Sequence, residues 1–231
     1  QATKDDLISL YHTPANKITV LYSGVEARFA PVRNEPALST VRARYGIGAA
    51  SYVLSVGTVQ PRKNYARLIE AMRALPDYHL VIAGGRGWLE GPIHAAARHP
   101  EVRGRVHFIG FAADADLPAL YSAADVFAFP SLYEGFGLPI LEAMACGVPV
   151  VAANTSSLPE VAGDAALLVD PTNTEALADT LRRALTNRAL RAELRQRGFA
   201  QARRFSWDAA SARLQAIYWR VLASAPDPEH V

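Results

Sequence analysis

Short apolar segments alternate with amphipathic segments through the middle of the chain. The segment Tyr52–Val56 (YVLSV) has the length and composition of a buried strand. In the segment Asn64–Leu75 that follows, apolar side chains recur at helical spacing. The same alternation predicts further strands at Tyr78–Ala83, Val106–Ile109, Asp125–Phe129, Val148–Ala152 and Ala166–Val169. It predicts further helices at Leu89–Arg98, Asp114–Ala123 and Leu138–Ala145.

Strands that are apolar along their length and alternate with helices predict a parallel sheet covered on both faces. The sequence therefore predicts an α/β fold with a doubly wound, Rossmann-like parallel sheet. Asp114 is expected to be the N-cap of the helix that it begins. In such a fold ligands bind beyond the carboxyl ends of the strands. The loops that follow the strands are thus the places where chemistry is expected.

The two ends of the chain carry weaker patterns. Before the alternation we expect a helix, a strand, a proline-bounded linker and a second helix, at Thr3–Tyr11, Ile18–Leu21, Pro31–Pro36 and Ala37–Tyr45. After it we expect three helices, at Thr174–Leu185, Arg188–Arg204 and Trp207–Leu222. Ala223–Val231 has the composition of a frayed tail.

The composition narrows the class of protein. The 231 residues are 50% hydrophobic and carry a net charge of +2, which is ordinary for a globular domain and gives no indication of a nucleic-acid partner. The single cysteine, Cys146, excludes an intramolecular disulfide and predicts a reducing, cytoplasmic compartment. Arginines crowd the C-terminal quarter; they are interpreted as a solvated helical face, with contact to a membrane surface as the alternative.

The loop after the first strand, Gly57–Asn64, places Arg62 and Lys63 where a helix begins. A helix N-terminus has unpaired N–H groups and a partial positive charge, so two cations there oppose the macrodipole. Such a placement indicates an anionic ligand such as a diphosphate rather than two surface cations.

Two further loops leave both a functional and a structural interpretation open. Gly84, Gly85 and Gly87 follow a strand and either let a ligand approach the backbone or form a plain turn. A flat nucleobase could lie against Phe108 and Ile109, although taken alone these residues are better explained as core.

The loop after the strand Asp125–Phe129 carries the strongest pattern, Ser131–Glu142. Gly135 and Gly137 open the backbone before a helix, where amides can receive phosphate or sugar oxygens. Glu134 and Glu142 lie on either side and can accept hydrogen bonds from hydroxyl groups of a sugar and a ribose. The structural alternative is that Glu142 caps amides and Glu134 is solvated.

This loop (EGFGLPILE) resembles the signature of the family-four retaining glycosyltransferases, in which seven residues separate two glutamates in an E-G-F-G-x-P-x-x-E context. The resemblance runs from about Ile18 to Trp219. Further similar segments are Gly57–Asn64 (GTVQPRKN), Ala143–Val151 (AMACGVPVV) and Leu158–Gly163 (LPEVAG).

The resemblance implies one half of the two-domain GT-B fold. It implies that residues 1–36 connect the two domains, residues 37–204 form the nucleotide-sugar-binding Rossmann-like domain, and residues 205–231 form the returning C-terminal helix and tail. The acceptor-binding N-terminal domain is not in the sequence, so the chain by itself is expected not to catalyse sugar transfer. Substrates implied are a nucleoside diphosphate sugar and a glycan or lipid-linked acceptor, in bacterial surface polysaccharide synthesis. The GTVQPRKN form resembles mannosyltransferases, which makes GDP-mannose the expected donor.

The resemblance also assigns roles to single residues. Arg62 and Lys63 would hold the diphosphate and stabilise the leaving group, and Glu134 would face the donor sugar. The implied donor-binding residues are Gly57, Thr58, Gly84, Phe108, Ile109, Gly135, Phe136, Gly137, Leu138 and Glu142, the last binding the ribose. No cofactor or metal is implied, in keeping with the scattered histidines. Many relatives carry an arginine at the position of Thr58, so one phosphate contact is either missing or supplied by Arg62.

Two other functions compete with this one. A dinucleotide oxidoreductase predicts G-x-G-x-x-G after the first strand, and the segment beginning at Gly57 lacks it. A noncatalytic module that binds sugar nucleotides would carry the same residues, and the sequence leaves it open.

Overall fold

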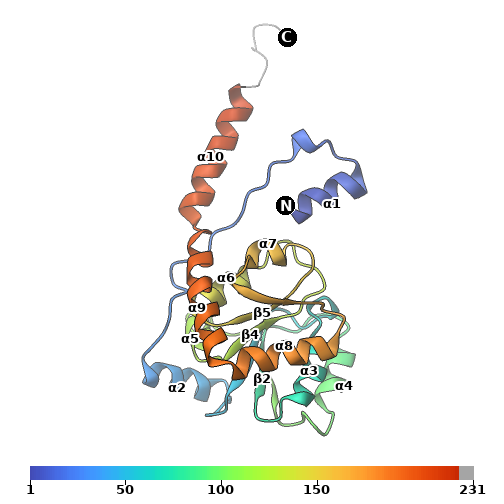
Figure 1. Cartoon of the computed structure of the whole chain (residues 1–231), viewed down its shortest axis with the longest axis vertical. Coiled ribbons are helices and arrows are strands. Elements are labelled where there is room, and N and C mark those ends of the chain that lie inside the picture. Colours follow the sequence, from blue (N-terminus) through green and yellow to red (C-terminus); the bar gives the residue numbers. More distant parts are fainter. Residues whose placement is uncertain (224–231) are drawn as a thin grey trace.

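The computed structural model describes residues 1–223, and the tail predicted from Ala223 onward lies outside the described residues except for Ala223 itself. Its centre is a six-stranded sheet in the order β3-β2-β1-β4-β5-β6 (Figure 1). The strands are β1 (Tyr52–Val56), β2 (His79–Ala83), β3 (Val106–Gly110), β4 (Val126–Phe129), β5 (Val150–Ala153) and β6 (Ala166–Val169). All neighbouring strands pair in parallel, which confirms the predicted fold class.

Helices cover both faces of the sheet because each strand buries side chains on both sides. Val53 of β1 packs with α3 (Tyr65–Ala71), α4 (Gly91–Ala97) and α8 (Thr174–Thr186). The next residue, Leu54, points to the opposite face, which is covered by α5 (Leu117–Ser122), α6 (Leu138–Ala145) and α7 (Leu158–Ala162). Outside these lie α2 (Glu35–Arg44) against α5 and α9 (Arg188–Arg203) against α6.

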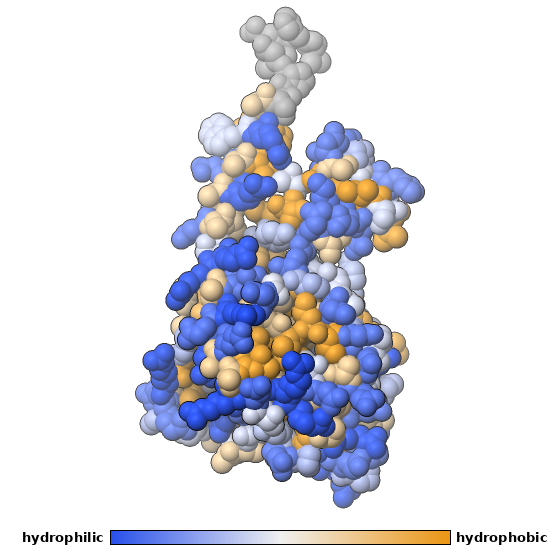
Figure 2. Space-filling view, in the orientation of Figure 1, coloured by the Kyte–Doolittle hydropathy of each residue, from blue (hydrophilic) through white to orange (hydrophobic). Residues whose placement is uncertain are grey.

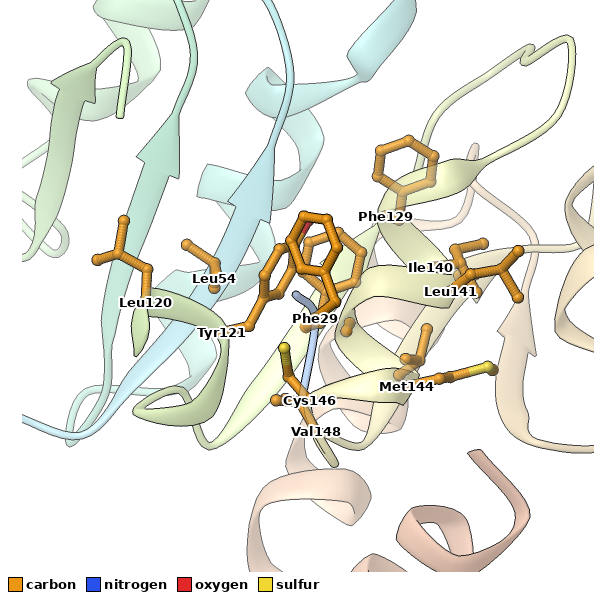
Figure 3. Packing of buried hydrophobic residues seen from close by; sticks show 14 of the residues in the cluster. Phe29, Leu54, Leu120, Tyr121, Phe129, Ile140, Leu141, Met144, Cys146 and Val148 are labelled. Carbon is orange, nitrogen blue, oxygen red and sulfur yellow. The ribbon is translucent and has the colours of Figure 1, made fainter. Parts of the chain in front are cut away.

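The second of these faces holds a core rich in aromatic rings. Figure 3 shows Phe29, which comes from the segment before α2, lying beside Tyr121 of α5. Their ring centroids are 5.9 Å apart in an edge-to-face arrangement. Phe127 and Phe129 of β4 stack at 5.7 Å on the same face. Each fully buried side chain of this size contributes about 1.5–3 kcal/mol of transfer free energy, so this core ties the N-terminal segment to the sheet.

Two local predictions were wrong, and one helix was not predicted. Ile18–Leu21 is extended but pairs with no strand in the described part of the chain, and an extended segment without a ladder partner is not a strand. Helix α5 begins at Leu117, so the residue before it is Asp116 and not Asp114. The carboxylate of Asp116 binds Arg44 and does not cap the helix. The helix α7 was not predicted, since five residues are too few to show a periodicity.

Several predicted boundaries also move. The expected linker ends early, since α2 begins at Glu35 with Pro36 in its first turn and Asn34 as its cap. The helix expected over Asn64–Leu75 is divided into α3 and a short 3₁₀ turn at Met72–Ala74.

The helices α1 (Ala2–Tyr11) and α10 (Trp207–Ala223) project from one end of the sheet body (Figure 1). Neither helix contains a buried residue. Large apolar side chains on both are exposed, among them Tyr11 and Trp219 at 75% and 67%, and hydrophobic residues are visible on both in Figure 2. None of the described helices is both long and apolar enough to cross a membrane.

The base of α10 is joined to the N-terminal segment through Gly24. A Cβ at this position would lie 2.2 Å from the backbone nitrogen of Trp207, and the amide of Val25 donates to Phe205 O at 2.9 Å. Only glycine therefore allows the two segments to approach this closely.

We expect Gly24→Ala to lower the free energy of unfolding by about 1–3 kcal/mol, because the backbone of Trp207 must move. Urea unfolding measures the loss, and faster amide exchange at Val25 locates it. Gly91→Ala is the control, since a Cβ at Gly91 meets no atom within 4 Å. Equal stability of the two variants would contradict the expectation.

Candidate functional site

The strand order reverses between β1 and β4, and the loops that follow these two strands meet there. The first loop, residues 57–64, contains a 3₁₀ turn at Pro61–Lys63 and leads into α3. The second, residues 130–137, leads into α6. The amide of Leu132 donates to Arg62 O at 2.9 Å and joins the loops. A crevice at such a reversal is the usual ligand site of a doubly wound sheet.

Arg62, Lys63 and Glu134 meet in this place and form what we call the charge cluster. Lys63 Nζ lies 2.7 Å from Glu134 Oε1, and Arg62 Nη1 lies 2.7 Å from Glu134 Oε2. The side chains of Lys63 and Glu134 are only 9% and 12% exposed, whereas Arg62 is 37% exposed. Two cations on one carboxylate leave the cluster with a positive charge in excess, as an anion site requires.

The backbone around Lys63 explains how a lysine is held in a buried position. Asn64 is in the left-handed region (φ 60°), and its Nδ2 donates to Pro130 O at 3.1 Å and to Pro171 O at 2.7 Å. Lys63 Nζ lies 4.5 Å from the centroid of the Phe129 ring, a cation–π distance. Gly57 has φ +146°, and a Cβ there would lie 2.6 Å from Lys63 Cε. The glycine makes room for the lysine side chain.

Two serines that the sequence analysis did not single out hold residues 130–137, which we call the acidic loop. Ser157 Oγ, which is buried, lies 2.8 Å from Glu134 O and 2.7 Å from Phe136 O, so its hydroxyl donates to this pair of carbonyls. Ser156 Oγ accepts from the amide of Glu134 at 3.0 Å. The available signal was their place in the loop between a predicted strand and the similar segment Leu158–Gly163.

The pKa values of the charge cluster reflect burial and charge in opposition. Burial by itself raises the pKa of Glu134, but Lys63 and Arg62 outweigh it and hold that pKa below its ordinary value. The pKa of Lys63 is also lowered, because burial outweighs the favourable contact with Glu134 and Arg62 adds repulsion. The two directions are compatible, since Glu134 faces two cations while Lys63 faces one anion and one cation.

Glu142 lies apart from the charge cluster, one helix turn into α6. Its Oε2 accepts a hydrogen bond from the hydroxyl of Tyr121 at 2.7 Å. Burial raises the pKa of Glu142, and the Tyr121 hydrogen bond opposes this shift only in part. The carboxylate therefore caps no amide of its own helix but is held against α5, and its ribose role stays a prediction.

The glycines and Phe136 of the acidic loop serve different ends. Gly137 has φ +118° and directly precedes Leu138, the first residue of α6. A Cβ at Gly135 meets no atom within 4 Å, so the space beside it is open. The ring of Phe136 packs with Tyr22 and Phe205 at centroid distances of 5.9 and 5.8 Å. The side chain of Phe136 thus anchors the loop to the body.

The remaining predicted residues lie on the other side of β1. A Cβ at Gly84 would lie 2.0 Å from Gly57 O, so glycine is needed where these loops touch. Thr58 lies at the same contact between the loops after β1 and β2, and its methyl group faces Gly87. Phe108 lines a cavity of about 370 Å³ beyond the ends of β1, β2 and β3. Ile109 faces the opposite side of the sheet and packs on the core that holds Phe29.

A larger cavity, of about 710 Å³, lies between Val25–Arg33 and the junction of α9 and α10. It is remote from the carboxyl ends of the strands, and its walls carry no part of the charge cluster. We therefore place the candidate site at the strand ends rather than in this larger cavity. Within residues 1–223 no group of three or more His, Cys, Asp or Glu side chains is arranged to hold a metal ion.

Comparisons with known proteins identify the family of the chain. The family model described as glycosyl transferases group 1 matches residues 40–201. O-antigen chain mannosyltransferase B of Escherichia coli is 38% identical over 211 residues, which are 89% of this chain and 55% of the relative. D-inositol 3-phosphate glycosyltransferase of Salinispora arenicola is 37% identical, over 95% of this chain and 53% of the relative. The chain spans about half the length of the curated relatives it matches.

Solved structures show the same architecture. Alr3699/HepE of Anabaena, in complex with UDP and glucose, superposes with a TM-score of 0.85 at 26% identity, over 97% of this chain and 62% of that chain. The C-terminal domain of a glycosyl transferase group 1 family protein of Francisella tularensis superposes with a TM-score of 0.64 at 27% identity, over 75% of this chain and 93% of that domain.

We expect Glu134→Gln to lower the free energy of unfolding by about 1–3 kcal/mol at neutral pH, because buried Lys63 loses a charged acceptor. The pKa of Glu134 is held below its ordinary 4.5, so as the pH falls the unfolded chain takes up the proton first. The stability that the carboxylate adds is present above pH 4.5 and is lost as the pH falls through the folded-state pKa.

Urea unfolding of both proteins between neutral pH and about pH 3 checks this expectation. The difference in unfolding free energy should shrink on acidification. A difference that stays constant over this range would show that Glu134 is not stabilised as an anion.

Proposed function

Because the chain belongs to the glycosyl transferases group 1 family, we propose that it is the donor-binding half of a retaining glycosyltransferase and binds a nucleoside diphosphate sugar. The charge cluster carries this proposal. It sets two cations at the strand-order reversal, where a diphosphate would lie. In the fold, the chain corresponds to one of the two domains of GT-B glycosyltransferases.

The diphosphate would bind Arg62 and Lys63 in place of Glu134. Phosphate oxygens carry more charge than one carboxylate, and Arg62 already extends to the surface to meet them. Glu134, once displaced, can accept a hydrogen bond from a hydroxyl of the donor sugar. The main-chain amides of Gly135–Leu138 stand beside it, at the start of α6, to receive sugar or phosphate oxygens.

In the proposed reaction the bond between the sugar C1 and the diphosphate oxygen breaks, the acceptor hydroxyl oxygen bonds to C1, and its proton passes to the departing diphosphate. Negative charge develops on the departing diphosphate. Arg62 and Lys63 are fixed where that charge grows, so they stabilise the transition state without a metal ion. The part played by this chain is positioning and charge stabilisation, and it supplies no covalent nucleophile.

GDP-mannose is the proposed donor, supported by the mannosyltransferases of E. coli among the relatives. A glycan or lipid-linked acceptor in surface polysaccharide synthesis is supported by the O-antigen role in the name of the first of them. A cytoplasmic location is supported only by the cysteine content, since the single Cys146 can form no intramolecular disulfide. The exposed apolar residues of α10 are consistent with a further domain, and the arginines of α9 with contact to a membrane surface.

A noncatalytic module that binds the same donor is the second candidate. It would carry the same charge cluster and bind the same nucleoside diphosphate sugar. Fusing an acceptor-binding half from a relative and assaying sugar transfer separates the two candidates. The dinucleotide oxidoreductase has no support from the family match.

We expect Lys63→Ala to weaken nucleoside diphosphate binding by roughly 1.5–3 kcal/mol and to leave nucleoside binding nearly unchanged, since the lost partner is a phosphate. Titration calorimetry with GDP, UDP and guanosine, in buffer without divalent metal, measures both losses. Lys17→Ala removes an exposed lysine remote from the sheet and serves as the control. Equal losses for nucleotide and nucleoside would refute the diphosphate role.

We expect Glu142→Ala to weaken binding by roughly 1.5–3 kcal/mol, because charged hydrogen bonds to ribose hydroxyls are lost. The matched ligand is a 2′,3′-dideoxynucleoside diphosphate, which lacks those hydroxyls and should bind wild type and variant alike. An unchanged affinity for the ordinary nucleotide in the variant would exclude the ribose role.

A further inference from the structure

A carboxylate that the sequence analysis passed over lies in the cavity beyond β1, β2 and β3. Glu90 lines this cavity together with Gly84, His94, Phe108 and Gly110. Its side chain is only 13% exposed. The volume of about 370 Å³ is in the range of small-ligand pockets, and glycines on two sides let a ligand reach the backbone.

Two neighbouring side chains orient this carboxylate, of which Arg86 is 90% exposed at the rim of the cavity. Arg86 Nε donates to Glu90 Oε1 at 2.8 Å, and His94 Nε2 lies 3.2 Å from Glu90 Oε2. The Arg86 hydrogen bond lowers the pKa of Glu90 below its ordinary range, so the group is an anion at neutral pH. A carboxylate has about four acceptor positions, and the protein uses two of them. Glu90 therefore keeps capacity for a ligand with two donors.

The walls of the cavity suit a flat ring. Phe108 and His94 present aromatic surfaces whose centroids are 4.7 Å apart and whose planes meet at 55°. Glu90 precedes α4 without capping it with its side chain, so its carboxylate is not needed by the helix. The preceding residue, Leu89, has φ 51°, a strained value for leucine that fixes the direction of the segment.

The cavity is connected to the charge cluster by one short loop. Val59, which lines the cavity, pairs with the loop after β2 through its amide and Gly85 O at 2.9 Å. The chain then runs directly through Gln60 and Pro61 to Arg62 and Lys63. The loop that follows β1 thus contributes both to the cavity, through Val59, and to the charge cluster, through Arg62 and Lys63.

We propose that Glu90 selects guanine, by accepting hydrogen bonds from N1–H and the 2-amino group of the base, an inference that rests on the proposed donor-binding function. Guanine is the common base with two adjacent donors on this edge. Uracil has one N–H between two carbonyl groups, and adenine and cytosine place a ring acceptor beside their amino group. Each of these would set a lone pair against the carboxylate.

Calorimetric titration of the whole chain with GDP, IDP and UDP tests this proposal. IDP differs from GDP only by the missing 2-amino group. We expect wild type to bind GDP about tenfold or more tighter than IDP, the effect of one charged hydrogen bond. In Glu90→Gln the difference between GDP and IDP should fall to about twofold or less, because a neutral amide replaces the carboxylate.

The control is Glu101→Gln, which removes an exposed carboxylate paired with Arg73 on the segment before the amino end of β3, whereas the cavity lies at the carboxyl ends of the strands. It should keep the wild-type preference. Equal binding of GDP and IDP by wild type, an unchanged ratio in Glu90→Gln, or UDP as the tightest ligand would overturn the guanine assignment and leave donor binding intact. Binding of none of the three would overturn the proposed function and this assignment together. The wild-type comparison does not depend on how the variant folds.

Discussion

The buried contact between the ammonium of Lys63 and the carboxylate of Glu134 is the constraint on which the site depends. Removing two charges from water is costly, and the contact persists only because the protein holds both groups in place. Asn64 anchors the loop that carries the lysine, and Ser157 anchors the loop that carries the glutamate. The energy of folding is thus used to keep two cations fixed where an anionic ligand would arrive.

The same contact defines how a donor would enter. Glu134 neutralises part of the positive charge of Arg62 and Lys63, and under the proposed function a diphosphate would compete with it. In that exchange Arg62 and Lys63 would keep their positions, and only the side chain of Glu134 would change its partner. Base, diphosphate and sugar would occupy neighbouring stretches of one sheet edge, from the Glu90 cavity through Lys63 to the start of α6.

The spacing of apolar residues predicted the helices and strands wherever an element was long and packed on the sheet. All six strands of the sheet were predicted, and the glycine-rich loops were assigned to their carboxyl ends. Ile18–Leu21 was mistaken for a strand because an apolar segment has the same composition with or without a ladder partner. Helix α7 was not predicted, because a helix of five residues is too short to show a helical period in the sequence.

The sequence by itself determined the fold class and the loops that carry chemistry, because strand and helix periods and the residues that end them are local properties. Only the tertiary structure decided which charges meet. Lys63 and Glu134 are 71 residues apart, and their contact follows from the order of the strands rather than from either loop. For the same reason Glu142 turns to Tyr121 instead of the cations, and Glu90 enters a cavity that no single segment encloses.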